Sequence, residues 1–168
     1  MSQMHKIPPE AILDNVFKLI GKDWMLVTAG TIEKWNTMTA SWGTLGVLWN
    51  KPVAFCFVRP TRHTFGFIDS AERFSLSFFE ERYRDALMLC GTKSGRDVDK
   101  SRATGLLPVP GDGTVYFEQA RLVLECRKLY TADIDPKRFL DPAIDENYPN
   151  KDYHRMFVGE VTDVLLRA

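Results

Sequence analysis

Residues 36–65, NTMTASWGTLGVLWNKPVAFCFVRPTRHTF, contain two segments with the composition of β-strands, followed by a turn rich in arginine. The first segment (37–49) is rich in threonine and tryptophan but carries two glycines. It predicts a strand that bends or bulges at Gly43 or Gly46. The second segment (52–58) is continuously apolar, bounded by prolines, and too short for a typical buried helix. We interpret it as a strand that is covered on both faces.

Segments outside this stretch also favour β structure. Strands are predicted at WMLVTAG (24–30), RFSLSFF (73–79), ARLVLECRKLYTADI (120–134) and MFVGEVTDVLLR (156–167). In RFSLSFF, large apolar residues alternate with serine, which predicts a strand buried on one face only.

Two helices stand out among these strands. Apolar residues recur at helical spacing in residues 8–23 and again in residues 80–91, where Cys90 lies on the apolar stripe. The helices do not alternate regularly with the strands, so a doubly wound parallel sheet is disfavoured. We expect a mainly β fold with helices, built on a closed or partly closed antiparallel barrel.

The composition is that of an ordinary globular protein. The chain has 168 residues, 45% hydrophobic and 26% charged, so we expect one domain over residues 1–168. Its 22 basic and 22 acidic residues cancel, which argues against a broad surface for nucleic acid. No segment has the ~20 apolar residues of a membrane helix, and the N-terminus lacks the layout of a signal peptide. A cytoplasmic protein with no nucleic-acid or membrane partner is the simple expectation.

Metal chemistry has little support in the sequence. Cys56, Cys90 and Cys126 are far apart and form no CxxC pair, and the chain has only three histidines. No zinc-ligand spacing can be assembled from them. We expect buried, reduced cysteines and no metal site.

The turn VRPTRHT (58–64) combines two guanidinium groups with hydroxyls. Arg59 follows the apolar strand, and Arg62 and Thr64 follow after a proline. Such a turn can hold a phosphate through charge-assisted hydrogen bonds and backbone N–H groups. The alternative is that both arginines are solvated or paired with nearby acidic residues.

A second polar segment, TKSGRDVDK (92–100), has the same chemistry. Ser94, Gly95, Arg96 and Lys100 supply a hydroxyl, a flexible backbone and two cations near a predicted helix N-terminus, where anions bind well. It is not a Walker loop, because it lacks the GK[ST] ending. A solvated loop explains the segment equally well on its own.

Nucleophilic catalysis has only weak support. The chain has no GxSxG motif, and Cys90 and His154 are far apart in the sequence. We interpret His154, which precedes a predicted strand, first as a hydrogen-bonded histidine at the rim of a site. A proton donor is the alternative.

The order of these segments resembles a known family. NTMTASWGTLGVLWNKPV, VRPTRHTFGFI, RFSLSFF, YRDALMLCGTKSGRDVDK, LECRKLY and DYHRMFVGEV together resemble the flavin reductase-like family, in its flavoredoxin-like branch. The resemblance extends from about Phe17 to Val164. It implies a six-stranded antiparallel split β-barrel that binds FMN and forms a homodimer, with FMN near the dimer interface.

The resemblance also implies roles for individual residues. It assigns Asn36 and the segment Thr39, Ala40, Ser41 and Trp42 to the isoalloxazine ring of FMN. It assigns Arg59, Arg62 and Thr64 to the phosphate and ribityl chain, and it implies further contacts from Gly91, Ser94, Gly95, Arg96 and Lys100. Many members carry tyrosine at the position of His63, and some are longer at the C-terminus.

Three functions are compatible with these features. The first is an NAD(P)H-dependent flavin reductase, which moves a hydride from NADH or NADPH to FMN and then on to an acceptor. The second is a flavoredoxin-like FMN electron carrier that is reduced by a partner protein instead of by nicotinamide. The third is a module that binds a phosphorylated ligand without redox chemistry.

Overall fold

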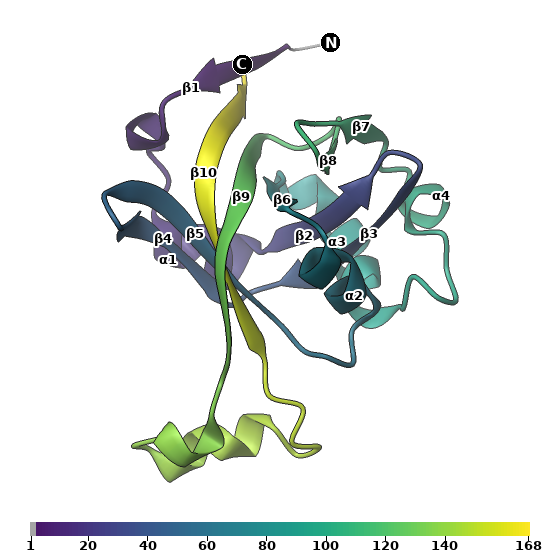
Figure 1. Ribbon diagram of the computed structural model, residues 1–168. Coiled ribbons are helices and arrows are strands. Elements are labelled where there is room, and N and C mark those ends of the chain that lie inside the picture. Colours follow the sequence, from purple (N-terminus) through teal and green to yellow (C-terminus); the bar gives the residue numbers. More distant parts are fainter. Residues whose placement is uncertain (1–2) are drawn as a thin grey trace.

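The computed structural model describes residues 3–168, in which β-strands are the most abundant regular structure and the helices are few and short (Figure 1). The mainly β fold is therefore confirmed. The strands are β1 (Met4–Ile7), β2 (Met25–Thr31), β3 (Lys34–Ala40), β4 (Gly43–Leu48), β5 (Lys51–Val58), β6 (Arg73–Phe78), β7 (Pro108–Pro110), β8 (Val115–Phe117), β9 (Leu122–Asp133) and β10 (Arg155–Arg167). The α-helices are α1 (Val16–Lys18), α2 (His63–Ser70), α3 (Arg84–Thr92) and α4 (Lys100–Thr104).

The main sheet is antiparallel and forms a split barrel. Among residues 3–168 it has eight strands, two more than the six expected, in the order β3-β2-β6-β9-β10-β5-β4 with β1 beside β10. β3 and β4 form the two ends, and within this part of the chain no pairing between them closes the barrel. The predicted split-barrel architecture is confirmed.

One continuous stretch of chain connects the two ends of the sheet. β3 ends at Ala40 and β4 begins at Gly43, so only Ser41 and Trp42 lie between them. The bend expected in residues 37–49 therefore lies just before Gly43. A Cβ at Gly43 would be 2.7 Å from the carbonyl oxygen of Phe55, so the close pairing of β4 with β5 requires glycine there.

β6 is buried on both faces, which the alternating sequence did not predict. Phe74, Leu76 and Phe78 face the main core, as expected. Ser75 and Ser77 are also buried, and the hydroxyl of Ser75 donates to the carbonyl of Val115 in β8. The small hairpin of β7 and β8 covers the face that the serines had indicated as solvent-exposed.

The N-terminal helix is shorter than predicted. Residues 8–23 form a 3-10 turn (Pro9–Ala11), then α1, then a π-helical turn (Leu19–Asp23), with an extended break at Ile12. Asn15 starts α1, because its side chain accepts a hydrogen bond from the backbone N–H of Lys18. The helical spacing of the apolar residues did indicate helical turns in this segment. The new helix start at Asn15 divides them, so they do not form one continuous helix.

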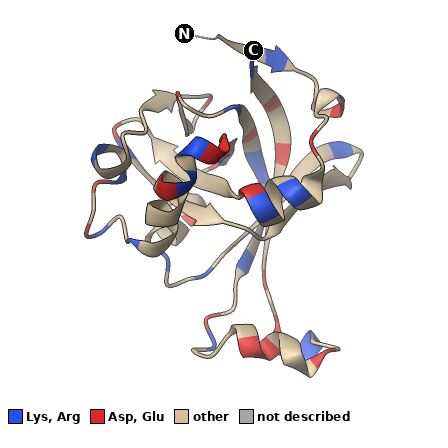
Figure 2. Cartoon of the chain, turned by 180° about the vertical axis from the view of Figure 1, so that it is seen from behind, with Lys and Arg blue, Asp and Glu red and all other residues tan. Residues whose placement is uncertain are grey.

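A long arm extends from the barrel. β9 and β10 run beyond the other strands, and residues 134–154 form the end of the arm with two 3-10 segments (Pro136–Arg138 and Pro142–Asn147) (Figure 1). Basic and acidic residues are interspersed along the arm and over the sheet (Figure 2). Leu140, near the end of the arm, is 99% exposed.

We expect Gly159→Ala to destabilise the fold. A Cβ at Gly159, in β10, would be 2.6 Å from the ring of Phe74 and 2.7 Å from the Cβ of Cys126, and both residues are fully buried. Overpacking of this kind costs about 1–3 kcal/mol. Urea denaturation should show this loss. The control Gly21→Ala, where a Cβ meets nothing within 4 Å, should change stability by less than about 1 kcal/mol. Equal effects of the two changes would contradict this account of the core.

Candidate functional site

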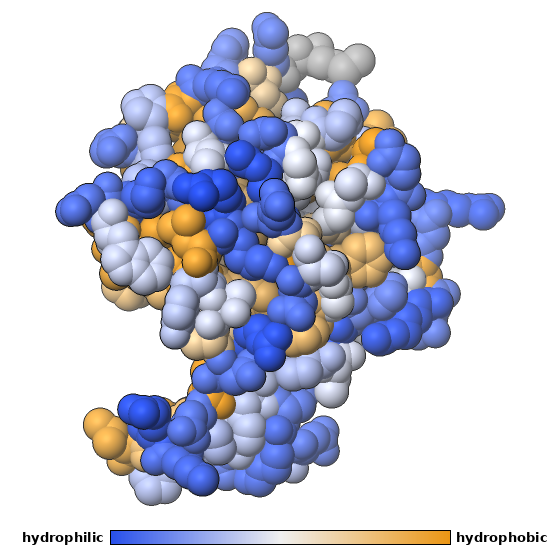
Figure 3. All heavy atoms as spheres, viewed as in Figure 1, coloured by the Kyte–Doolittle hydropathy of each residue, from blue (hydrophilic) through white to orange (hydrophobic). Residues whose placement is uncertain are grey.

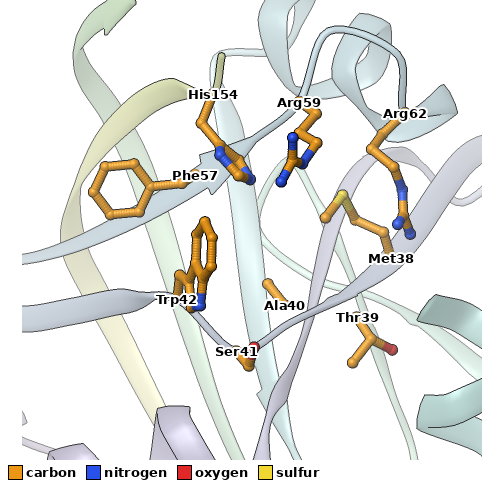
Figure 4. Close-up of a pocket in the computed structure, with 9 residues that line it drawn as sticks. All are labelled: Met38, Thr39, Ala40, Ser41, Trp42, Phe57, Arg59, Arg62 and His154. Atoms are coloured by element: carbon orange, nitrogen blue, oxygen red, sulfur yellow. The ribbon is translucent and has the colours of Figure 1, made fainter. Parts of the chain in front are cut away.

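The residues singled out by the sequence gather in two pockets. The first, the Trp42 pocket, has a volume of about 170 Å³ and lies at the connection between β3 and β4, the two ends of the sheet. Figure 4 shows its lining side chains. Its lining residues are Met38, Thr39, Ala40, Ser41, Trp42, Phe57, Arg59, Arg62 and His154. The second, the loop pocket, has a volume of about 180 Å³. Its lining residues are Asn36, Thr61, Arg62, His63, Thr64, Gly91, Thr92, Lys93, Ser94, Gly95, Arg96 and Lys100.

The connection between β3 and β4 forms one wall of the Trp42 pocket. Trp42 is 46% exposed, and its ring lies 5.2 Å from that of His154. Figure 4 shows Trp42, Phe57 and His154 on one side of the pocket, with Met38 and Arg62 on the other. The pocket therefore combines flat and apolar surfaces with guanidinium groups.

Arg59 is bound to the base of the arm. Its guanidinium donates to Asp152 (2.9 Å) and to the carbonyl of Asn147 (2.8 Å), and it lies 4.7 Å from the centre of the Tyr148 ring. Arg59 lines the Trp42 pocket, not the loop pocket that contains Thr64. Arg59 therefore does not share a pocket with Thr64, with which the sequence analysis grouped it. Asp152 and the carbonyl of Asn147 already bind its guanidinium group.

Arg62 is the residue that lines both pockets. Its guanidinium donates to the carbonyls of Gly91 (3.0 Å) and Cys90 (3.4 Å) at the end of α3. These contacts leave some of its five N–H donors available to a ligand. A molecule that extends from one pocket into the other would pass this side chain.

Lys100 is a buried cation that joins three elements. Its ammonium group, at the start of α4, donates to the carbonyls of Thr37 (2.6 Å) in β3 and Cys90 (3.0 Å) in α3. Burial lowers the pKa of Lys100 to about 8. Lys100 lies at the loop pocket, and its hydrogen bonds position the walls of the pocket.

Asn36 also lies in the loop pocket instead of beside the Trp42 segment. Its side-chain amide donates to the hydroxyl of Thr64 (2.8 Å), and both side chains are buried. Gly95 packs against this amide so closely that a Cβ would be 2.0 Å from Oδ1 of Asn36. Glycine at position 95 therefore allows the loop after α3 to close over β3 and α2.

Two free cations border the loop pocket. The side chains of Lys93 and Arg96 are exposed and have no hydrogen-bond or ion-pair partner among residues 3–168. No side chain caps the N-terminus of α2, whose first residues, His63 and Thr64, line the same pocket. Free cations and a helix N-terminus together favour an anion.

Some lining residues were not selected from the sequence. Lys93 and Thr61 belong to the two polar segments and could have been included on their chemistry alone. Phe57 was hidden in a continuously apolar strand, where it and Phe55 are only half-buried while their neighbours are fully buried. No local signal separates a pocket-lining phenylalanine from a core one in such a run.

His154 is a buried, neutral histidine. Its Nδ1 forms a hydrogen bond of 2.8 Å with the hydroxyl of Tyr148, as the rim interpretation expected. Burial, and then the positive charge of Arg59, lower the pKa of His154 to about 4. At neutral pH His154 therefore carries no charge, so it is not poised as an acid.

The three cysteines are all free and buried, as predicted. Burial raises the pKa of Cys56 and Cys90, so neither thiol ionises readily. In residues 3–168, no helix has the length and apolar character needed to cross a membrane.

Comparison with known proteins identifies a family. The family model described as flavin reductase like domain matches residues 18–168. A search of curated proteins found no match.

Several solved structures are similar to this chain. An FMN-binding domain of a flavin reductases-like enzyme from Shewanella baltica is 16% identical, with a TM-score of 0.71 over 99% of this chain and 78% of that one. An FMN-binding protein from Thermus thermophilus is 26% identical, with a TM-score of 0.66 over 96% and 79%. Flavoredoxin from Methanosarcina acetivorans is 23% identical, with a TM-score of 0.67 over 97% and 75%.

We expect His154 to make folding stability depend on pH. In the unfolded chain His154 gains a proton near pH 6.5, whereas the folded chain resists protonation until about pH 4. The unfolded state therefore binds more protons between these values, and stability falls as the pH drops through this window. Chemical denaturation from pH 7 to 4 should show this fall, and His154→Gln should reduce it. An NMR titration that gives His154 a pKa of 6.5 or higher would contradict the prediction.

Proposed function

Since the chain belongs to the flavin reductase-like family, we propose that it binds FMN across the two pockets and works as a flavin-dependent oxidoreductase. The observation that carries this proposal is that an open pocket with aromatic walls and a pocket bordered by unpaired cations meet at one arginine, Arg62. FMN has the same two parts, a flat ring and a phosphate, joined by a short chain.

The Trp42 pocket suits the isoalloxazine ring. Trp42, Phe57 and Met38 supply flat or apolar surface, while the hydroxyls of Thr39 and Ser41 lie on the connecting strand. Ligand sites of this kind are largely apolar with a few polar groups that fix orientation. The Thr39 hydroxyl donates to the carbonyl of Leu87, so it holds α3 against β3 and can still accept a hydrogen bond.

The loop pocket suits the phosphate group. Lys93 and Arg96 are free cations, Ser94 adds a hydroxyl, and the N-terminus of α2 adds backbone N–H groups. A phosphate dianion is held by such charge-assisted hydrogen bonds. Of the two arginines in the turn, Arg62 is the one that belongs to this pocket.

When bound, the flavin supplies hydride and electron transfer, and the protein supplies orientation and electrostatics. Arg59 and Arg62 place positive charge beside the Trp42 pocket, which favours a ring that gains negative charge. His154, neutral at pH 7, adds a hydrogen-bonding group without opposing these cations. The arrangement therefore favours the reduced form of a flavin without a dedicated protein acid.

The source of electrons defines two candidates. We favour an NAD(P)H-dependent flavin reductase, because the Trp42 pocket is open and its tryptophan is about half exposed, so a second flat ring has access. The alternative is a flavoredoxin-like carrier that receives electrons from a partner protein. The same open surface would then be a docking site for that partner.

A homodimer is part of the proposal. Large apolar side chains are exposed at the end of the arm (Leu140 and Ile144) and on the hairpin between β4 and β5 (Val47 and Trp49). Figure 3 shows apolar surface at the end of the arm. Apolar surface of this kind is typical of protein interfaces. Sedimentation equilibrium should give twice the chain mass of 19.2 kDa, and a monomer mass would overturn this part.

We expect Arg62→Ala to weaken FMN binding about 10- to 100-fold, which corresponds to the loss of a charge-assisted hydrogen bond of about 1.5–3 kcal/mol. Arg59→Ala should have a smaller effect, because Asp152 and Asn147 already bind its guanidinium. Quenching of flavin fluorescence measures both affinities. The control is Arg127→Ala, an arginine outside both pockets that pairs with Glu160. Equal, negligible losses at positions 59 and 62 would show that the phosphate lies elsewhere.

We expect NADH or NADPH to reduce the FMN-loaded protein. Anaerobic stopped-flow mixing would follow the loss of the oxidised flavin absorbance near the visible maximum. Bleaching by either nicotinamide supports the reductase. Bleaching only by a reduced redox protein would replace it with the carrier, and a protein that takes up no FMN would leave a non-redox phosphate-binding module.

A further inference from the structure

A buried hydrogen bond joins two side chains at the base of the arm. It connects the hydroxyl of Tyr148 to Nδ1 of His154 over 2.8 Å. Tyr148 is 3% exposed and His154 is 7% exposed, so water does not compete for this bond. His154 lines the Trp42 pocket, whereas Tyr148 does not. Tyr148 can therefore act on the pocket only through His154.

Packing on several sides fixes the ring of Tyr148. The guanidinium of Arg59 lies 4.7 Å from its centre, and the rings of Phe139 and Tyr153, both in the arm, lie 6.2 and 4.8 Å away. Arg59 is itself bound to the arm through two hydrogen bonds. The Tyr148 hydroxyl therefore has little freedom to move away from Nδ1 of His154.

The hydroxyl of Tyr148 is the donor in this bond. Burial raises the pKa of Tyr148, although the charge of Arg59 and the backbone N–H of His154 act in the opposite direction. The hydroxyl thus keeps its proton at neutral pH, and positive groups already face its oxygen, which leaves the proton for Nδ1. A neutral imidazole has one N–H and one accepting nitrogen. Since Nδ1 accepts, His154 carries its proton on Nε2.

Nε2 of His154 is available to a ligand. It has no hydrogen-bond partner among residues 3–168. The buried side-chain atoms without a partner in that part of the chain are Ser77 Oγ and Thr114 Oγ1, so Nε2 is not enclosed by protein. The ring of His154 lies 5.2 Å from that of Trp42, at the wall of the Trp42 pocket (Figure 4). His154 thus presents one uncharged N–H to the pocket.

We propose that Tyr148 is a positioning residue, which holds His154 in the tautomer and ring orientation that direct the Nε2 N–H into the Trp42 pocket. The inference rests on the proposed function, since the acceptor of this N–H is then a polar atom at the edge of the flavin ring. A preorganised donor interacts most strongly with an acceptor that gains negative charge. The N–H therefore favours reduced over oxidised flavin, and His154 gives up no proton.

Tyr148→Phe tests this role, because it removes the hydroxyl and keeps the ring that packs against Arg59. The matched control is Tyr153→Phe, the same change in the same arm. The hydroxyl of Tyr153 donates to Asp145 (2.7 Å) instead of to His154, and Tyr153 lines neither pocket.

The first measurement is the reduction potential of bound FMN, from equilibration with a dye of known potential. We expect Tyr148→Phe to weaken the binding of reduced FMN about three- to tenfold relative to oxidised FMN, the effect of one lost hydrogen bond. This ratio lowers the two-electron potential by about 14–30 mV. Tyr153→Phe should leave the potential unchanged. In a His154→Gln background, Tyr148→Phe should cause no further change, because the imidazole that it positions is gone.

The second measurement is nitrogen NMR of the full chain, labelled with ¹⁵N-histidine and without added flavin. The chemical shifts of Nδ1 and Nε2 show which nitrogen carries the proton, and His154→Gln identifies the signals of His154 among those of the three histidines. The wild type should show His154 with its proton on Nε2. Tyr148→Phe should give a mixture of the two tautomers, and Tyr153→Phe should not.

The outcomes separate this inference from the proposed function. A wild-type proton on Nδ1 of His154 would overturn the inference, and so would equal shifts in potential from Tyr148→Phe and Tyr153→Phe. An undiminished effect of Tyr148→Phe in the His154→Gln background would also overturn it, because the hydroxyl would then act without the imidazole. If the wild type takes up no FMN, the proposed function fails, while a tautomer that depends on Tyr148 still supports its positioning of His154.

Discussion

The carbonyl groups at the C-terminus of α3 hold the candidate site together. A helix end leaves such carbonyls without partners inside the helix, and here they accept hydrogen bonds from Arg62 and Lys100. Thr39 donates to a carbonyl one turn earlier in the same helix, that of Leu87. These three donors come from β3, from the turn after β5 and from α4. Because one helix binds all three, it fixes the distance between the strand wall of the Trp42 pocket and the loop pocket. A buried ammonium group is costly, so its presence at Lys100 indicates how much this junction requires cationic donors.

The sequence indicated which residues lie together at the two pockets, but it did not indicate how they are arranged there. The polar segments were recognisable because each combines hydroxyls and cations within a few residues, and all the selected residues line one of the two pockets. The different hydrogen-bond partners of the two arginines in the turn were not predictable. Arg59 and Arg62 are three residues apart and chemically identical, yet Asp152 engages one and the end of α3 engages the other. Those partners are distant in the chain, so only the fold reveals them.

The fold, too, was predictable only where it depends on residues that are close together in the sequence. Strand segments and the antiparallel barrel followed from composition and alternation, which are local properties. The break in residues 8–23 depends on one asparagine that caps a helix, and the burial of both faces of β6 depends on a hairpin about forty residues later. Alternation with serine indicates a polar face, but it cannot say whether water or another strand covers that face.

The short connection between β3 and β4 has a consequence for how such a protein can vary. Ser41 and Trp42 connect the two ends of the sheet and also form the wall of a pocket. An insertion there would move Trp42 away from Arg62 and widen the split at the same time, so the length of this connection is constrained twice. The end of the arm, where Leu140 is 99% exposed, has no such double role. Changes in chain length are therefore accommodated more easily at the end of the arm than in the connection between β3 and β4.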